Sequence, residues 1–388
     1  MDKNKTKKTG NCERTLATYM VLFAALKPIT TSLPQHSTLI LAACAIMLVL
    51  FVLFSSKTLS FSMGFVSIVF CVFMFLLADV LFRPNSSQSE LLYNFLIYGV
   101  LPLFLLSKVE DVKQLAYAYA WLTVIIGIVY LVDPLNSYKW SSNYMTFGFS
   151  AMLPAVCGCL IMIHMFEKKK FWCPMLIFAL ASLIFANKGV FLSEIAMIAT
   201  AYILFTKNST KRFLIIVALL IAMFYIYPIL SAILDFAAAI ADSLSIDSYA
   251  LDTFSVILKN TNSNSVYDSR LDIWKIAFDL FSENPFLGHG AGFFDSHYNG
   301  YTHNVFLDVM VAYGSVGLVF LGIIIVASVS KIRRMSDRHL SVFAALLFMS
   351  WLFPLQVSSY FWSTLTFWLY WGICFFDFKH TEKNVLSD

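Results

Sequence analysis

Charged residues are scarce in this chain. Asp, Glu, Lys and Arg make up only 13% of its 388 residues, whereas hydrophobic residues make up 59% and the mean hydropathy is +0.76. A soluble globular domain carries about twice that share of charge. The composition therefore predicts a protein that lies in a lipid bilayer, and the small net charge of +4 carries no signal of nucleic-acid binding.

Cysteine is absent from the polar stretch 229–303, where it could form disulfides or bind a metal. All seven cysteines lie in apolar runs or in short basic segments, and none falls within the polar stretch 229–303. That absence excludes a disulfide framework and a thiolate zinc site in this stretch. Internal repeats, low-complexity tracts and a separate soluble domain are absent from the sequence too, so residues 1–388 read as one membrane domain.

Long apolar runs divide the chain into segments that can each cross a hydrocarbon core of about 30 Å. They predict an all-α polytopic membrane protein with about twelve spans, which lie near residues 16–33, 38–54, 60–82, 91–106, 114–132, 145–166, 172–187, 189–206, 213–235, 304–328, 340–356 and 359–376.

Basic residues test this count independently, because short cytoplasmic loops carry the excess of Lys and Arg. With the amino terminus inside, the inner segments hold all 27 basic residues except Lys27, Arg83, Lys139, Lys188, Lys259, Arg270 and Lys275. This distribution predicts that both termini are cytoplasmic and that the loop 229–303 is external. The basic stretch 1–14 leads into the first span without a small-residue cleavage site, which is typical of an uncleaved anchor.

The external loop has helical patterns of its own. Residues 236–246 are expected to form an amphipathic helix on the membrane surface. Ser269 and Asp272 form a capping box, and an apolar stripe then predicts a helix to about Glu283, ended by Asn284-Pro285. Thr302 is expected to cap the next span and to place His303 in its first turn.

Four motifs in this region resemble the bacterial O-antigen polymerases and O-antigen ligases. Together they are fairly specific, and they cover roughly residues 185–320. The motifs are Ser269-Arg270-Leu271-Asp272-Ile273-Trp274, Asn284-Pro285-Phe286-Leu287-Gly288-His289-Gly290-Ala291-Gly292-Phe293, Thr302-His303-Asn304-Val305-Phe306-Leu307 and the stretch from Gly314 to Gly317.

The resemblance implies a glycosyltransferase that resembles the GT-C type and acts on glycans carried by undecaprenyl diphosphate. It also implies a place in the bacterial inner membrane, a periplasmic position for the loop 229–303, no cofactor and no metal. Membrane lipid is an implied partner, and a flippase and a chain-length regulator are candidate partners. No nucleic-acid partner is expected.

Arg270 is the first candidate catalytic residue. Departure of a diphosphate leaves at least two negative charges, and a guanidinium can hold two phosphate oxygens at once. The alternative is that Arg270 pairs with Asp268 or Asp272 on its own helix.

Lys188 follows Asn187 at a position where the family usually carries arginine, so the charge is kept but the two-pronged geometry is lost. Its alternative role is that of a lysine that reaches the interface from a helix end.

His303 is the candidate base that accepts the proton of the attacking sugar hydroxyl. A helix amino terminus disfavours imidazolium and keeps the ring able to accept a proton. Two alternatives remain open. His303 is either a diphosphate ligand at the same helix end or an interfacial residue without a catalytic role.

Further residues are candidates for holding the diphosphate or the glycan. The turn from Gly288 to Gly292 can bring backbone amides close to a ligand, or it can be a turn and nothing more. His289, His297 and Asp295 show no recognisable ligand spacing, so no metal site is expected. The full set of predicted binding residues is Lys188, Arg270, Gly288, His289, Gly290, Gly292, Tyr301 and Asn304.

Three acidic residues within the apolar runs need an explanation, because charge in a membrane is costly. Asp79 and Glu194 are each either functional or a structural partner of Arg83 or Lys188. Asp308 follows His303 by five positions and is a candidate to orient its ring.

Within the family, the sequence favours a polymerase that joins repeat units over a ligase that moves finished glycan to lipid A–core. Lys188 departs from the arginine expected in ligases, and the segment Asn143-Tyr144-Met145-Thr146-Phe147-Gly148 resembles capsule and O-antigen polymerases. A transporter of lipid-linked sugar is the rival class, since twelve spans with both ends inside is also a transporter plan. A membrane scaffold for a polysaccharide machine is the third reading, and it leaves the clustered polar motifs unexplained.

Overall fold

The computed structural model of the protein describes residues 3–32, 37–55, 62–132, 145, 147–186, 188–206, 208–213, 236, 239, 243, 267–357 and 360–376. Within these ranges every regular element is a helix. The predicted span 213–235, the predicted surface helix 236–246 and Asn187 lie essentially outside the described residues. Only Met145, Phe147 and Gly148 of the segment 143–148 are described.

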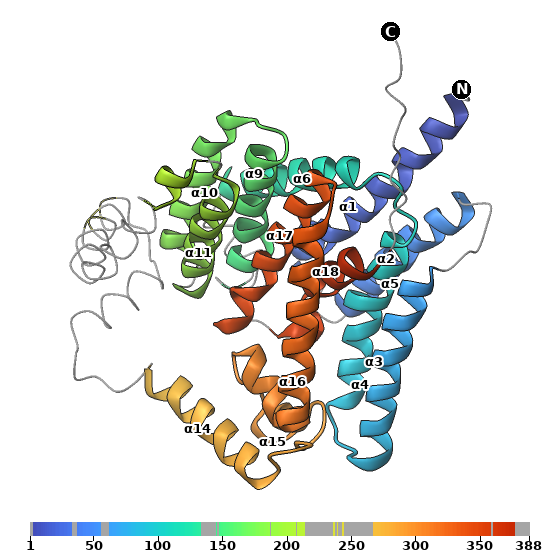
Figure 1. The fold of residues 1–388 in the computed structure, drawn as a ribbon, viewed down its shortest axis with the longest axis vertical. Helices are drawn as coiled ribbons and strands as arrows, with labels where there is room; N and C mark the ends of the chain where they lie inside the picture. Colours follow the sequence, from blue (N-terminus) through green and yellow to red (C-terminus); the bar gives the residue numbers. More distant parts are fainter. Residues whose placement is uncertain are drawn as a thin grey trace.

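The helices form a bundle (Figure 1). In chain order they are α1 (Lys3–Ser32), α2 (Ser37–Ser55), α3 (Met63–Phe82), α4 (Gln88–Asn94), the π-helix η2 (Phe95–Val100), α5 (Leu101–Leu106), α6 (Val112–Val132), the π-helix η3 (Phe147–Met152), α9 (Leu153–His164), η4 (Lys169–Phe171), α10 (Trp172–Phe185), α11 (Lys188–Phe205), α14 (Tyr267–Glu283), α15 (Phe293–Tyr298), α16 (Val305–Arg334), α17 (Arg338–Leu352), η5 (Pro354–Gln356), η6 (Phe361–Ser363) and α18 (Leu365–Phe375).

Six stretches of the described chain are long and apolar enough to cross a membrane: Met63–Phe82, Gln88–Leu106, Val112–Val132, Phe147–His164, Val305–Arg334 and Arg338–Gln356. Shorter apolar helices cover Leu39–Phe54, Gly189–Phe205 and Leu365–Phe375. The chain is therefore an all-helical, multi-pass membrane protein. Each predicted span within the described ranges overlaps a helix, because a segment in lipid must satisfy its backbone groups internally, but not every one of these helices is long enough to cross a membrane.

The main core lies where α1, α6 and α9 pack together. Gly158 of α9 faces α6 so closely that an added Cβ would lie 2.2 Å from the hydroxyl of Thr123, and this small residue lets the two helices approach. The π-turns of η2 leave a carbonyl available, and the buried Tyr19 donates its hydroxyl to the Ile97 carbonyl at 2.5 Å. This packing forms the frame that carries the site.

A smaller apolar cluster sits at the end of the bundle opposite the start of α1, where Figure 1 shows α14 and α15 beside the first part of α16. Ala277 and Leu280 of α14 pack there against Leu307, Met310 and Val311 of α16. The predicted end of α14 at Glu283 is confirmed. The predicted capping box is wrong, because α14 is already helical at Tyr267 and Ser269 lies inside it.

The start of α16 differs from the prediction as well. Its N-cap is Asn304, whose side-chain oxygen accepts from the amides of Phe306 at 2.9 Å and Leu307 at 3.3 Å. Thr302 does not cap the helix, because its hydroxyl donates to Asp308 at 2.8 Å. His303 therefore precedes the helix and does not lie in its first turn.

Candidate functional site

An ion pair at the end of α3 is hydrogen-bonded to the turn 288–292, which we call the glycine turn. Asp79 is fully buried, and Arg83 Nη2 lies 2.5 Å from its Oδ1. Arg83 Nη1 also donates to the carbonyl of Leu287 at 2.7 Å, and the amide of Ala291 donates to Asp79 Oδ2 at 2.9 Å. The prediction that Asp79 is a structural partner of Arg83 is confirmed. The ion pair and the hydrogen bond from Ala291 stabilise the buried charge of Asp79, and the same bonds hold the turn in place.

The glycine turn docks onto a break in α16. Gly314 has φ 61° and ψ −154°, so the helical hydrogen bonds around it cannot form. Residues 285–290 satisfy the freed groups on both sides of the break. The bonds are His289 N to Val311 O at 2.8 Å, Gly290 N to Ala312 O at 2.8 Å, Ser315 N to Pro285 O at 2.8 Å and Val316 N to Phe286 O at 3.3 Å.

This docking bears on the predicted ligand role of the turn. The amides of His289, Gly290 and Ala291 all donate to acceptors of the protein, and the amide of Gly288 donates to the Asn284 carbonyl at 3.0 Å. A phosphate would have to displace these bonds. The glycines instead permit close approach, since a Cβ on Gly288 would lie 2.5 Å from the Val311 carbonyl oxygen.

His303 lies between the glycine turn and α16 in an unusual conformation. Its φ is 58°, in the left-handed region that non-glycine residues rarely adopt. Its Nδ1 is buried and has no hydrogen-bond partner among the described residues. Burial, and secondly the charge of Arg270, lower the pKa of His303 to about 4. The ring is therefore neutral at physiological pH and can accept a proton, as the sequence predicted, although burial is the cause and a helix terminus is not.

Arg270 lies close enough to His303 for its charge to act on the imidazole. It is partly buried in the early part of α14, and Trp274 follows one turn later on the same face. The indole of Trp274 donates to the carbonyl of Thr302 at 3.1 Å, which fixes α14 beside the residue that precedes His303. Among the described side chains Arg270 forms no ion pair with Asp272, while the side chain of Asp268 lies outside them.

Lys188 is the first residue of α11, and its side chain lies outside the described part of the structure. Its helix contacts η5, and Gln356 of η5 accepts a hydrogen bond from the side chain of Asn304 at 3.0 Å. The element that carries Lys188 is thereby linked to the segment that carries His303. Both functional groups of the Asn304 side chain, one in the cap and one toward Gln356, serve local structure.

The remaining predicted residues separate into distinct environments. Glu194 is fully buried on α11, where it accepts from the Ser182 hydroxyl at 2.7 Å. His289 Nε2 lies 2.8 Å from the Leu280 carbonyl, and its ring stacks on Phe293 at 4.5 Å between centroids. His297 stacks on the other side of Phe293 at 4.0 Å.

Asp308 does not orient the ring of His303. Its Oδ1 accepts from both the amide and the hydroxyl of Thr302, at 3.1 and 2.8 Å. The expected contact with His303 is wrong, because Oδ1 is bonded to Thr302 and neither Oδ2 of Asp308 nor Nδ1 of His303 has a hydrogen-bond partner among the described residues. Asp308 Oδ2 is buried and has no hydrogen-bond partner among the described residues.

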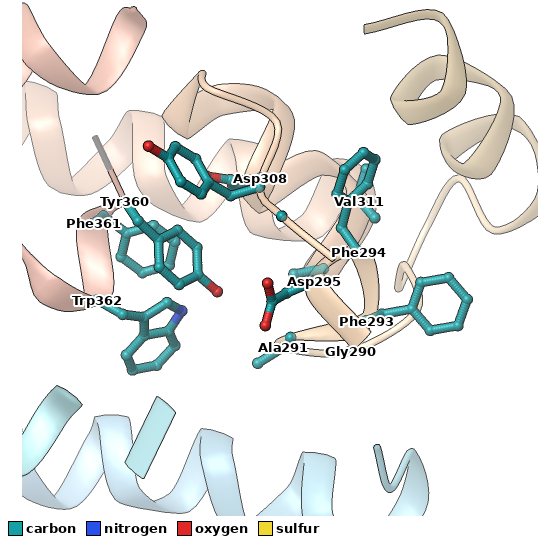
Figure 2. Close-up of a pocket in the computed structure, with 14 residues that line it drawn as sticks. Gly290, Ala291, Phe293, Phe294, Asp295, Asp308, Val311, Tyr360, Phe361 and Trp362 are labelled. Carbon is teal, nitrogen blue, oxygen red and sulfur yellow. The ribbon is translucent and has the colours of Figure 1, made fainter. Parts of the chain in front are cut away.

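A pocket beside His303 contains residues that the sequence did not single out. Figure 2 shows the Asp295 carboxylate facing the hydroxyl end of Tyr360 and the indole nitrogen edge of Trp362. Gly290, Gly292, Tyr301 and Asp308 also line the pocket. The predicted span 359–376 concealed the aromatic residues, since helix α18 begins only at Leu365 and residues 361–363 form a separate turn. Because they are aromatic, the sequence predicted that they lie in a membrane span.

The tyrosine rings connect this pocket to His303. Tyr301 lies 4.3 Å from the His303 ring and 5.4 Å from the Tyr360 ring, measured between centroids, and it stacks on Tyr360. Burial and the nearby charges of Asp308 and Asp295 raise the pKa of Tyr360, so its hydroxyl keeps its proton and can donate.

These features define a multi-pass membrane protein with a polar, partly buried site at one end of its helices. Residues 173–322 match the family model described as O-Antigen ligase. The match confirms, for these residues, the resemblance to the O-antigen ligase and polymerase family seen in the motifs. No curated protein and no solved structure matches the chain.

The matched region includes α10, α11, α14, α15 and the broken part of α16, together with Arg270, the glycine turn and His303. It points to a function of the O-antigen ligase and polymerase type. Members of the family are enzymes of the glycosyltransferase kind, and the family implies a lipid-linked polysaccharide as substrate.

Proposed function

We propose that this protein is an O-antigen polymerase, which joins oligosaccharide repeat units carried on undecaprenyl diphosphate at the periplasmic face of the bacterial inner membrane. The observation that carries the proposal is a partly buried His303, whose pKa is lowered, close enough to the cation Arg270 for its charge to act on the ring. A proton acceptor next to a fixed positive charge suits a reaction in which a hydroxyl is deprotonated and a diphosphate departs.

In the proposed reaction the acceptor hydroxyl gives its proton to His303 as its oxygen attacks the anomeric carbon of the donor glycan. A glycosidic bond forms, the bond from the anomeric carbon to the diphosphate oxygen breaks, and the electron pair leaves with undecaprenyl diphosphate. Attack from the face opposite the leaving group inverts the anomeric configuration. The imidazolium then returns its proton to the departing diphosphate or to water.

Arg270 and Lys188 are proposed to hold the departing diphosphate. Cations of the chain itself supply the charge neutralisation, so the transfer is metal-independent in this scheme. In this scheme the partly buried position of His303 limits the access of water to the base, which would favour a sugar hydroxyl over hydrolysis. Of the other predicted binding residues, Gly290, Gly292 and Tyr301 line the pocket, whereas Gly288, His289 and Asn304 are assigned structural contacts.

The choice of polymerase over ligase rests on the sequence. Lys188 replaces the arginine expected in ligases, and the segment 143–148 resembles polymerases. Both termini are proposed to be cytoplasmic, with the loop 229–303 in the periplasm and with a flippase and a chain-length regulator as partners. A ligase that transfers glycan to lipid A–core is the alternative within the same chemistry.

Purified protein in proteoliposomes, given undecaprenyl-diphosphate-linked repeat units from its own strain, is expected to produce a ladder of glycans that differ by one repeat unit. Gel electrophoresis and mass spectrometry of the lipid-linked products measure the ladder. With lipid A–core added to the same proteoliposomes, transfer of glycan to it without a ladder would establish the ligase. Movement of the lipid-linked sugar across the bilayer without any new glycosidic bond would establish a transporter.

A further inference from the structure

An open pocket of about 350 Å³ lies where the ends of α6, α9 and α17 meet. Its lining includes Lys113 in the first turn of α6, Arg338 and His339 in the first turn of α17, and residues 165–167, which directly follow α9. All three helices belong to stretches that are long and apolar enough to cross a membrane. The pocket is therefore at the level of a membrane surface.

This pocket and His303 are at opposite ends of α16. His303 lies just before Val305, the first residue of that helix, and Arg338 lies just after Arg334, its last residue. The part of α16 that follows the break, residues 315–334, spans about 30 Å at 1.5 Å per residue, which is enough to cross the hydrocarbon core. The pocket therefore lies at the membrane face opposite the site at His303, and in the proposed orientation this face is cytoplasmic.

Cations line this pocket from two different helices. Lys113 and Arg338 are both exposed, so their charged ends are accessible to a ligand. Lys168 adds a positive charge nearby, because its ammonium lies 4.8 Å from the ring centroid of Tyr117 and bonds to the hydroxyl of that residue at 3.3 Å. Tyr117 in turn contacts Phe166 of the pocket. A ligand in the pocket therefore meets positive charge from more than one side.

The carboxylates near these cations do not neutralise them. Glu167 Oε1 lies 3.7 Å from Nη1 of Arg338, but the two side chains are 75% and 56% exposed, and such exposed pairs contribute little. Asp111 and Asp337 each accept from backbone amides at the start of the helix that follows them. Across the segments 108–113, 167–170 and 331–338, nine Lys and Arg residues outnumber four Asp and Glu residues. The charge of this face therefore favours an anion.

The pocket also has an aromatic part. Phe166 lines it, stacks on His339 with 6.4 Å between ring centroids, and packs edge-on against Tyr117 at 5.1 Å. The glycerol part of a phospholipid can contact this ring while its phosphate contacts the cations. A small soluble anion would use the cations alone. The combination of charge, an aromatic surface and a position at the membrane face therefore favours a lipid headgroup.

We propose that this pocket binds the headgroup of an anionic phospholipid, with the phosphate diester held by Lys113 and Arg338 and the glycerol part against Phe166. Basic pockets between membrane helices at the cytoplasmic face bind such headgroups. The bound lipid bridges α6, the end of α9 and α17, and it stabilises the folded protein because it binds only when these three ends are together. This binding site does not depend on the transfer reaction proposed for His303.

Native mass spectrometry of the full-length protein tests the site. The protein is released from detergent micelles that contain increasing amounts of phosphatidylglycerol, and the fraction with bound lipid is measured. Lys113→Gln combined with Arg338→Gln should lower the affinity about tenfold to thirtyfold, because each cation near a membrane surface contributes several-fold to the binding of anionic lipid. Lys113→Arg combined with Arg338→Lys keeps both charges and should bind about as the wild type does.

Lys169→Gln combined with Arg333→Gln is the matched control. Both residues are exposed on the same membrane face but do not line the pocket, so the affinity should stay within about twofold of the wild type. Glu167→Gln removes the carboxylate that lines the pocket and should tighten binding about threefold, a gain that a misfolded protein would not give.

Three results would overturn the proposal. Equal losses in the pocket variant and the control would show that the whole basic face attracts lipid without a specific site. Full binding by the Lys113→Gln, Arg338→Gln protein would show that these cations do not hold the phosphate. Displacement of the phosphatidylglycerol by millimolar inorganic phosphate would identify a soluble phosphate as the ligand.

Discussion

A His303→Asn protein is expected to lose about 10²- to 10⁴-fold in the rate of glycan elongation while it retains binding of the repeat-unit oligosaccharide. Asparagine is the appropriate replacement because the residue at 303 has a φ of 58°, a left-handed conformation that asparagine tolerates better than most residues. The variant therefore removes the proton acceptor with little added backbone strain. The measurement is the initial rate of ladder formation in proteoliposomes at saturating acceptor.

His297→Asn is the control for this prediction. His297 is an exposed histidine that stacks on Phe293 and bonds to the backbone carbonyl of the same residue at 2.9 Å. Its replacement should leave elongation within about twofold of the wild type. A His303→Asn protein that elongates at a comparable rate would show that another group accepts the proton.

Gly314→Ala is expected to give the largest loss of stability among single substitutions in the site. An added Cβ would lie 2.4 Å from the carbonyl oxygen of Phe286, and the φ of 61° with ψ of −154° is open essentially to glycine alone. The residues 285–290 would have to move away and give up their backbone bonds to both sides of the break. We expect a loss of about 3 kcal/mol or more, seen as a fall of several degrees in the thermal unfolding midpoint of the purified protein.

Gly322→Ala provides the matched control on the same helix. Nothing lies within 4 Å of a Cβ at Gly322, so the alanine should leave stability unchanged or raise it by up to about 1 kcal/mol. Because the glycine turn lines the pocket that Tyr301 connects to His303, Gly314→Ala should also slow elongation. Equal unfolding midpoints for the two variants would show that the break in α16 is not what anchors the turn.

Much of the helical arrangement could be predicted from the sequence. Apolar runs such as 63–82 and 112–132 become helices because lipid leaves the backbone no other partner. The ends of the helices were less predictable where more than one residue could form the cap. Thr302 and Asn304 are both good capping residues, and Asn304 became the cap because Asp308 binds the Thr302 hydroxyl.

The break in α16 was invisible in the sequence for a different reason. A single glycine within an apolar run is compatible with a continuous membrane helix. The helix α16 is interrupted at Gly314, where residues 285–290 form hydrogen bonds with the backbone on both sides. The same docking engages the amides of His289 and Gly290 within the protein, while the proposed binding role of the turn stays a prediction. Both features depend on contacts between residues 285–290 and α16, which are not visible in the local sequence.

The candidate site was predictable in part. Arg270 and His303 stand out because they are polar groups in motifs between membrane spans, and the charge of Arg270 does act on His303. The pocket was not predictable, because Asp295 meets Tyr360 and Trp362 only in the folded protein. In the sequence these aromatic residues are indistinguishable from the membrane span that follows them.

The pH dependence of elongation tests most directly whether a neutral His303 beside Arg270 is the base. Because the pKa of His303 is lowered to about 4, the ring is unprotonated above that pH, and the wild-type rates at pH 5 and pH 7.5 should be nearly equal. Arg270→Gln removes the neighbouring charge and should raise this pKa, so that its rate falls between pH 7.5 and pH 5, whereas Arg270→Lys keeps the wild-type profile. A wild-type rate that drops roughly thirtyfold at pH 5, as an ordinary histidine would give, would contradict the assignment of His303.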